Sequence, residues 1–466
     1  MRLTFPLIRF LAVAFCFAIA TVSFAALPPN IVVILADDLG SGDVGWRGGE
    51  IKTPNLDKLA RDGARLEQFY VQPVCSPTRA ALLTGRYPMR HGLQVGVVRP
   101  WADFGLPLGE RTLAEALREA GYKTGIFGKW HLGHFAPEYL PTRRGFDRQY
   151  GHYNGALDHF DHTRDGGFDW HRDDKVSRDE GYSTELIARE TVKFIREQDG
   201  PFFAYVPFTA VHAPLQVPEK YKKPYAHLPP RRANYAGMLA AMDEAVGQIV
   251  AAIENRGVRT NTFIFFSTDN GGPNPGNLTS NGEFRAGKGT VYEGGVRACA
   301  FANWPGQIPS NSVVNVPLHI VDLYPTLLKL GGAKIEQKLP IDGRDCWAAL
   351  SGVEGAQGRE EILINATPNS GALRVGDWKL VINGKRTDQA DGPVRNEESG
   401  AQTMELFNLA KDPSEKNDLS KTEPEKVREL RARFDALARE QVPPKIFPKP
   451  AGFRSPKIWG EKEEAK

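Results

Sequence analysis

The sequence predicts an α/β fold in which a large, mixed but mostly parallel β-sheet is sandwiched between helices. Runs of apolar residues at 30–36, 202–208 and 262–267 predict buried strands. Segments with helical periodicity alternate with these strands, and that alternation is typical of a parallel sheet covered on both faces. The composition, 41% apolar and 25% charged, is that of a globular protein rather than a disordered or fibrous one.

Pairs of Thr or Ser with Pro predict two helix starts. Residues 53–54 are Thr-Pro, and the helix that they open stops near Gly63. Residues 76–77 are Ser-Pro and follow Cys75, so Cys75 is expected at the N-terminus of a helix. In chain order, the other predicted elements are a helix opened by the capping box at 112–115 and ended by Gly121, a strand at 123–127, and helices at 183–198 and 235–255.

The pattern changes after about residue 350. Short strands are predicted at 375–383 and 404–408, and an amphipathic helix at 421–439, which together favour a small α+β subdomain. The predicted division is a signal peptide at 1–25, a main domain at 26–350, a C-terminal subdomain with a short antiparallel sheet and a helix at 351–442, and a polar tail at 443–466.

The N-terminus has the features of an export signal. Arg2 and Arg9 precede or flank an apolar stretch at 11–20, and small residues occupy the cleavage region at 23–25. We therefore expect an exported protein that is periplasmic, extracellular or lysosomal according to the host. No membrane span is expected after the signal peptide.

The net charge bears on the kind of partner that the protein binds, and the number of cysteines bears on the kind of site that it contains. The formal net charge of +3 gives no electrostatic reason to expect a nucleic-acid partner. Three cysteines follow the signal peptide, an odd number that points to one special cysteine. Cys299 and Cys346 either form a disulfide or remain buried free thiols, which singles out Cys75. The oligomeric state is left open.

Polar side chains follow the predicted strands, where ligands bind in open parallel sheets. Asp37 and Asp38 follow the first strand, and Asp269 and Asn270 follow the strand at 262–267. Either pair alone is typical of a turn, but three carboxylates and an amide at one edge would repel each other without a cation. Oxygen donors alone favour Ca²⁺ or Mg²⁺ over zinc. The sequence therefore predicts one hard-cation site.

The segment around Cys75 has a specific pattern. Residues 75–79 are Cys-Ser-Pro-Thr-Arg, and Thr-Gly follows at 84–85, which resembles the signature of the type I sulfatase family. The resemblance extends over about 29–419 and is closest to the arylsulfatase B-like branch, the N-acetylgalactosamine-4-sulfatase type. Further stretches similar to the family lie at 128–133, 141–147, 211–218, 267–272, 293–297 and 405–409.

The resemblance implies a nucleophile made after translation. Cys75 would be oxidised to formylglycine by a formylglycine-generating enzyme that recognises Pro77 and Arg79 in the unfolded chain. The aldehyde would hydrate to a gem-diol, of which one hydroxyl attacks sulfur and the other expels sulfate. The implied fold is that of alkaline phosphatase, and the implied reaction is hydrolysis of a sulfate ester.

The resemblance also assigns roles to the other polar residues. One Ca²⁺ per chain, with Mg²⁺ as the alternative, would be bound by Asp37, Asp38, Asp269, Asn270 and an oxygen of residue 75. Arg79 and Lys129 would hold the gem-diol, and Lys129 and Lys288 would bind sulfate oxygens. His131 would take a proton from the diol, and His212 would protonate the leaving oxygen or contact the ester oxygen.

Three functions are compatible with these residues. The first is removal of sulfate from a sulfated sugar or glycan, such as N-acetylgalactosamine 4-sulfate. The second is hydrolysis of phosphomonoesters or phosphodiesters, which would call for a second metal with additional His and Asp ligands. The third is sulfoglycan binding without catalysis. A single predicted metal set, with lysines at the anion site and an intact nucleophile, favours the sulfatase. The segment at 158–174, rich in His and Asp, is either part of the sugar pocket or ordinary surface.

Overall fold

The computed structural model describes residues 28–274, 278–384 and 402–461. Its main feature is a mixed sheet of 11 strands in the described part of the chain. Five central strands run parallel, in the spatial order β10 (Thr262–Thr268), β1 (Asn30–Ala36), β9 (Phe202–Pro207), β3 (Lys123–Lys129) and β4 (Arg148–His152). The predicted signal peptide at 1–25 lies outside the described residues.

Antiparallel pairings extend this parallel centre on both sides. On one side β11 (Arg297–Asn303) and β2 (Ala64–Tyr70) follow β10, and β12 (Ser312–Val314) and β13 (Leu318–His319) pair with β2. On the other side β7 (His171–Arg172) and β8 (Lys175–Val176) follow β4. The mixed, mostly parallel sheet that the sequence predicts is therefore confirmed.

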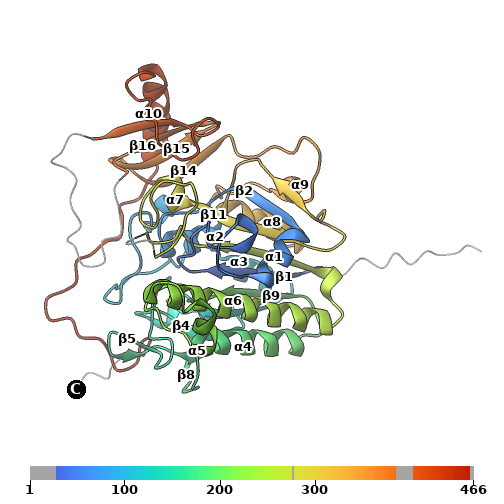
Figure 1. The fold of residues 1–466 in the computed structure, drawn as a ribbon. Helices are drawn as coiled ribbons and strands as arrows, with labels where there is room; N and C mark the ends of the chain where they lie inside the picture. Colours follow the sequence, from blue (N-terminus) through green and yellow to red (C-terminus); the bar gives the residue numbers. More distant parts are fainter. Residues whose placement is uncertain (1–27, 275–277, 385–401, 462–466) are drawn as a thin grey trace, which may run out of the picture.

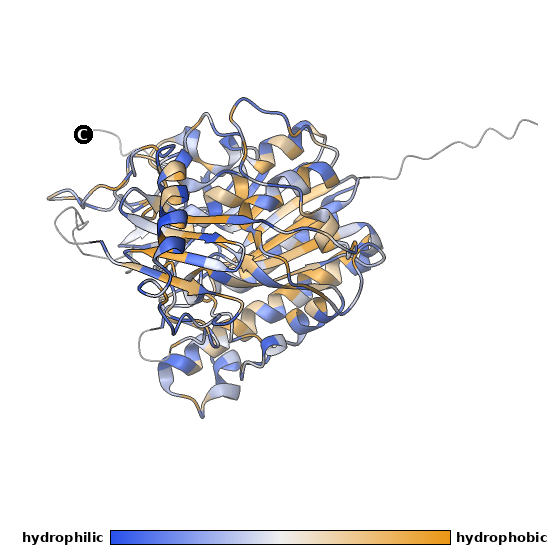
Figure 2. Ribbon diagram, turned by 90° about the horizontal axis from the view of Figure 1, so that it is seen from above, coloured by the Kyte–Doolittle hydropathy of each residue, from blue (hydrophilic) through white to orange (hydrophobic). Residues whose placement is uncertain are grey.

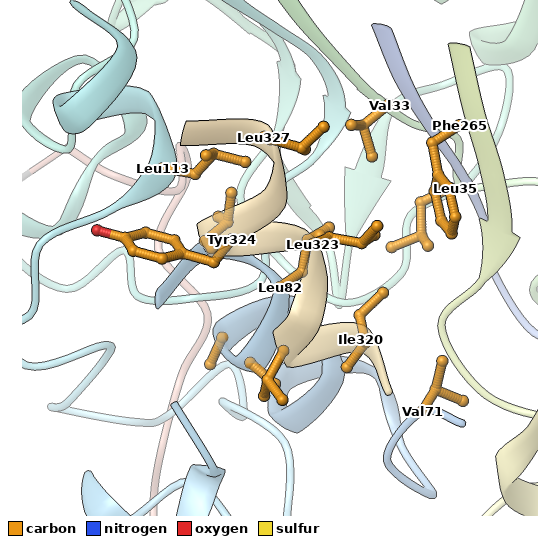
Figure 3. Close-up of a cluster of buried hydrophobic side chains, with 14 of the residues drawn as sticks. Val33, Leu35, Val71, Leu82, Leu113, Phe265, Ile320, Leu323, Tyr324 and Leu327 are labelled. Carbon is orange, nitrogen blue, oxygen red and sulfur yellow. The ribbon is translucent and has the colours of Figure 1, made fainter. Parts of the chain in front are cut away.

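Helices cover both faces of the sheet because the strands are apolar on both sides (Figure 1). In β1, Ile31, Val33 and Leu35 face one core, and the alternate residues face the other. The first core contains α2 (Cys75–Thr84), α3 (Leu113–Glu119) and α8 (Leu323–Leu330), and the second contains α1 (Pro54–Arg61), α4 (Ser183–Glu197) and α6 (Pro230–Asn255). Figure 3 shows Leu323 and Leu327 of α8 lying toward Val33 and Leu35.

The predicted capping box forms, whereas Thr53 is the N-cap of α1 without a side-chain cap hydrogen bond, and Ser76 lies inside α2, whose N-cap is Val74. Thr112 and Glu115 form a complete capping box at the start of α3. The helix α2 begins at Cys75, as predicted, and ends at Gly85, whose φ of 67° is the left-handed conformation common at helix ends.

Among the described residues, α6 meets the length and hydropathy expected of a membrane span. The expectation that no segment after the signal peptide is long and apolar enough to span a membrane is therefore wrong for the length and composition of α6. Most of the apolar stretch of α6 is buried, in the same core as residues of α4, β1 and β9, so its hydropathy is that of a core helix. Figure 2 shows hydrophobic residues gathered in the central sheet and on the helices against it.

The C-terminal subdomain consists of a small antiparallel sheet and one helix. The sheet has the order β14 (Glu361–Thr367), β15 (Ser370–Val375), β16 (Trp378–Ile382) and β17 (Met404–Asn408), and α10 (Pro424–Ala438) packs on it. The strand predicted at 375–383 is wrong at its start, because Gly376, with a φ of 56°, turns the chain between β15 and β16. The short elements are α5 (Glu219–Lys222), α7 (Glu293–Val296), α9 (Trp347–Leu350) and the hairpin of β5 (Thr163–Arg164) with β6 (Gly167–Phe168).

Cys299 and Cys346 are buried free thiols. Cys299 lies in β11 and faces the core of α4 and α6, whereas Cys346 packs in the core on the opposite face of the sheet. The alternative that they form a disulfide is therefore wrong, because the sheet separates them.

Candidate active site

The carboxyl ends of β1, β10 and β3 bring the predicted polar residues to one edge of the sheet. Ala36 and Thr268 are register partners at the ends of β1 and β10, so Asp37 and Asp269 follow side by side. The main-chain NH of Asp38 donates to Oδ1 of Asp269 at 3.2 Å. Asp38 has a φ of 63°, a conformation that Asp tolerates better than most residues.

Cys75 lies beside these carboxylates at the N-terminus of α2. Its side chain is buried, and its Sγ is 3.5 Å from Oδ1 of Asp37. Burial, together with Asp269 and Asp37, raises the pKa of the Cys75 thiol well above its ordinary value. An unmodified Cys75 is therefore a neutral thiol, which is a weak nucleophile.

Three cations neutralise the buried carboxylates. Nη2 of Arg79 is 2.7 Å from Oδ2 of Asp269, and Nζ of Lys129 is 2.5 Å from Oδ2 of Asp37. Nζ of Lys288 is 2.9 Å from the carboxylate of Asp38. All of these side chains are less than a tenth exposed, so the charges are paired where solvent screens them little.

A main-chain carbonyl group fixes the ring of His131 on one side. Its Nε2 lies 3.0 Å from the carbonyl oxygen of Val98, which can only accept, so Nε2 carries the proton. Nδ1 has no hydrogen-bond partner among the described residues and keeps its lone pair. Burial, with Lys129 and Arg79, holds the pKa of His131 well below its ordinary value. Gly155 packs against the ring so closely that a Cβ there would lie 2.3 Å from it.

His212 approaches the same carboxylates from the loop after β9. Its Nε2 is 3.6 Å from Oδ2 of Asp38, and its ring is 19% exposed, which leaves it accessible to a ligand. Burial and Lys288 lower its pKa to about 3, although Asp38 acts in the opposite direction. The ring of His159 fixes this loop, since its Nε2 lies 3.3 Å from the carbonyl oxygen of His212.

The donor atoms fit a hard divalent cation. Asp37, Asp38, Cys75 and His212 present ligand atoms within 4.8 Å of one another. Nδ2 of Asn270 donates to Asp38 at 2.8 Å, while its Oδ1 is buried without a partner in the described structure. Buried carboxylates with an unpartnered amide oxygen are the ligands that Ca²⁺ or Mg²⁺ prefers.

All the predicted site residues therefore lie in one cluster. The predicted catalytic residues are Cys75, Arg79, Lys129, His131, His212 and Lys288, and the predicted metal ligands are Asp37, Asp38, Cys75, Asp269 and Asn270. The compact group of possible metal ligands differs from the predicted one because it includes His212. Asp269 and Asn270 lie outside that group and are connected to it by hydrogen bonds with Asp38.

Several supporting residues escape sequence reasoning. Val98 acts through its main chain, which bonds both His131 and Oγ of Ser76, and no side-chain pattern reveals that. His159, in the segment 158–174, is fully buried. His162 and His171 are likewise buried, so the surface alternative for these histidines is wrong.

Comparison with known proteins identifies the family. The sulfatase family model matches residues 29–333. The chain belongs to the sulfatase family. It is 37% identical to mouse arylsulfatase J over 467 residues, which covers 90% of this chain and 77% of that protein. It is also 37% identical to mouse N-acetylgalactosamine-6-sulfatase over 350 residues, covering 69% and 66% of the two chains.

A solved structure agrees with this assignment. The crystal structure of Ps i-CgsB in complex with k-i-k-neocarrahexaose superposes with a TM-score of 0.81 at 30% identity, covering 91% of this chain and 96% of that one. The fold is thus the alkaline-phosphatase-like fold of the sulfatases. This sulfatase is an enzyme that hydrolyses sulfate esters.

Proposed function

We propose that this sulfatase removes sulfate from a sulfated sugar or glycan, with a formylglycine made from Cys75 and one bound Ca²⁺. The observation that carries the proposal is the position of Cys75. It lies buried at the start of α2, beside Asp37 and within a ring of three cations. Since the thiol itself is neutral there, conversion to an oxygen nucleophile explains why this position is so polar.

In this proposal, Ca²⁺ and formylglycine would supply the electrophilic and nucleophilic chemistry. Bound Ca²⁺ would be held by Asp37, Asp38 and Asp269 and would lower the pKa of a neighbouring hydroxyl, and formylglycine would provide the attacking oxygen. Mg²⁺ is the alternative ion, because the donors are all hard oxygens apart from His212.

The cationic side chains position the anion. Lys129 and Lys288 lie on either side of the aspartates, at β3 and in the loop before α7, where they can bind sulfate oxygens. Arg79 is fixed by two hydrogen bonds to Asp269, from Nε at 3.1 Å and Nη2 at 2.7 Å, and so holds its charge in one place. Fixed cations stabilise charge that accumulates on transfer of the SO₃ group.

The two histidines divide the proton transfers. His131 offers the lone pair of Nδ1, because its Nε2 proton is committed to Val98, so it acts as the base. His212 is neutral in the free chain, and a sulfate anion bound beside it would raise its pKa toward the charged form. In that form it protonates the leaving oxygen.

The relatives support a sulfated sugar as the substrate. One is named an N-acetylgalactosamine-6-sulfatase, and a structural relative was solved with a neocarrahexaose. We therefore include both 6-sulfated and 4-sulfated galactosamine sugars, with sulfated galactans, among the candidate substrates. A single candidate metal group among the described residues favours sulfate over a two-metal phosphatase reaction.

Maturation and location complete the proposal. A formylglycine-generating enzyme is the required partner during synthesis, and the signal peptide at 1–25 would export the chain. No nucleic-acid partner is proposed.

The proposal is tested by measuring sulfate release from 4-O- and 6-O-sulfated galactosamine sugars, with the matching phosphate esters in parallel. Protein made together with the maturation enzyme should release sulfate, and Cys75→Ala should abolish that release. Cys299→Ala is the matched control, since Cys299 is also a buried free thiol but lies in the core of α4 and α6. Full activity of Cys75→Ala, or a preference for phosphate, would contradict the proposal.

A further inference from the structure

The chain does not end at α10 but returns along the catalytic domain. The segment 441–461, defined here as the strap, forms main-chain hydrogen bonds with the loop that follows α2. The NH of Val442 donates to the carbonyl of Met89 at 2.9 Å, and the NH of Lys445 donates to that of Gly92 at 2.8 Å. These contacts fix the first part of the strap to the domain that contains the active site.

The far end of the strap is fixed by Trp459. Its main-chain NH donates to the carbonyl oxygen of Phe168, and its indole Nε1 donates to the carbonyl oxygen of Arg164, both at 2.9 Å. The indole is only 3% exposed and meets the ring of His134 edge-on, with centroids 5.3 Å apart. The strap is therefore anchored at both ends, which holds its middle part against the domain.

The middle of the strap forms a patch in which Phe447 and Lys449 are exposed and the rings of Trp101 and Phe453 are half-buried. The strap patch consists of Trp101 from the loop and Phe447, Lys449 and Phe453 from the strap. Nε1 of Trp101 donates to the carbonyl of Phe447 at 3.0 Å, and its ring lies 6.2 Å from that of Phe453. Nζ of Lys449 is 5.8 Å from both ring centroids, and Phe447 is 55% exposed.

Trp101 of the strap patch follows, three residues later in the sequence, a residue that contacts the predicted catalytic residue His131. The NH of Val98 donates to Oγ of Ser76, the neighbour of Cys75, and the carbonyl of Val98 accepts from His131. Trp101 is three residues further on, so its Cα is at most roughly 11 Å from that of Val98. Because Val98 bonds to residues beside Cys75, a second or third sugar ring of an oligosaccharide held at Cys75 would extend toward Trp101.

The charge of the strap suits an anionic ligand. It contains Lys445, Lys449, Arg454 and Lys457 against the single acid Glu461. Exposed aromatic faces mark interaction surfaces, and a basic surround attracts anions. A sulfated glycan offers both an apolar ring face and negative charge.

We propose that the strap patch binds a sulfated oligosaccharide through the rings beyond the one that bears the scissile sulfate. Trp101 and Phe447 provide stacking surfaces, and Lys449 pairs with a sulfate on a neighbouring ring. The substrate class is then a sulfated oligosaccharide rather than a free monosaccharide. This inference rests on the proposed function.

The test compares kcat/KM for sulfated hexasaccharides, a chondroitin sulfate and a neocarrahexaose, with that for 4-nitrophenyl sulfate, which cannot reach the patch. Trp101→Ala and Lys449→Glu should each lower the ratio of hexasaccharide to aryl sulfate kcat/KM at least tenfold. Trp347→Ala and Lys193→Glu are matched controls, since Trp347 packs on Phe263 at the amino end of the central strand β10 and Lys193 lies on α4. An unchanged ratio in the patch variants would overturn the inference.

A binding measurement separates this inference from the proposed function. Calorimetry with Cys75→Ala and the same hexasaccharides reports affinity without turnover. If the wild type releases no sulfate, the proposed function fails. The strap patch then still stands if Cys75→Ala binds a hexasaccharide and adding Trp101→Ala weakens that binding at least tenfold. No binding, or binding that Trp101→Ala leaves unchanged, overturns the patch.

Discussion

At the scale of single residues, the site combines three buried carboxylates with three buried cations. Each cation has its own carboxylate partner, so the cluster is close to neutral although little water reaches it. Such an arrangement is expensive to desolvate and persists where it serves a reaction. The histidines are neutral in it, one with an open lone pair on Nδ1 and one partly accessible to solvent.

The role of His212 can be tested through the leaving group. Because an acid matters most when the departing oxygen is a poor leaving group, His212→Ala should lower kcat about 100-fold or more on a sugar sulfate. It should have a clearly smaller effect on 4-nitrophenyl sulfate, whose phenolate leaves without a proton. His227→Ala, at an exposed histidine before α6, is the control. Equal losses on both substrates would rule out an acid role.

The identities of the site residues could be predicted, but not all of their supports. Asp37, Cys75 and Asp269 have chemistry and spacing that a sequence displays. The contributions of Val98 and Gly155 come from a carbonyl group and from the absence of a side chain, which any loop sequence can provide. They become visible only once the chain is folded.

At the scale of elements, prediction succeeded where a strand is apolar on both faces. The bounds of β1 agree with the expectation, and β9 and β10 differ by one residue at their ends. The sequence pattern does not indicate the strands β2 and β11. In β2, which lies toward the side of the sheet, the adjacent Glu67 and Gln68 interrupt the alternation of polar and apolar residues, and β11 consists largely of small residues. Neither pattern carries a strong hydrophobic period.

An ion-pair group links the small sheet to the catalytic domain. Lys379 of β16 is fully buried between Glu293 of α7, at 2.8 Å, and Glu415, at 2.9 Å. Next to Glu293, the NH of Gly294 donates to the carbonyl oxygen of Arg285, which lies in the loop that contains Lys288. The small sheet therefore supports a loop of the active site.

This group predicts a pH-dependent stability. Burial raises the pKa of Glu415 from 4.5 to about 7, despite Lys379. The folded chain then retains a proton that the unfolded chain releases, so this contribution to stability is full below about pH 4.5 and is lost as the pH rises to about 7. One proton corresponds to a slope of at most about 1.4 kcal/mol per pH unit.

Glu415→Gln removes that titration. The Tm of the variant, measured by calorimetry from pH 4.5 to 8, should gain on the wild type as the pH rises. Glu354→Gln, at an exposed acid in the same part of the chain, should follow the wild type. A constant difference between Glu415→Gln and the wild type across this range would show that Glu415 does not retain the proton.

At the scale of the whole molecule, the sheet brings distant parts of the chain to one edge. Asp38 and Lys288 are 250 residues apart and yet form an ion pair. The layered fold could be predicted from the alternation of strands and helices. The path of the tail could not, because its contacts with the catalytic domain use main-chain groups and scattered aromatic rings.

Metal binding should stabilise the whole fold, because the ligands come from the ends of separate strands. Adding Ca²⁺ to chelator-treated protein should raise the Tm, by an amount equivalent to about 2.7 kcal/mol at 100 times Kd. Asp38→Asn should weaken that shift while keeping the left-handed backbone, which Asn also accepts. Glu244→Gln, on the exposed side of α6, is the control. A Tm that does not respond to Ca²⁺ would argue against the site.

The central claim is that residue 75 acts through an oxygen that replaces its sulfur. Mass spectrometry of the peptide spanning residue 75, taken from active protein made with the maturation enzyme, tests this directly. The account predicts that the peptide has the mass of the aldehyde or its hydrate, and that this fraction rises in step with sulfatase activity. A fully active preparation in which residue 75 is entirely unmodified cysteine would contradict it.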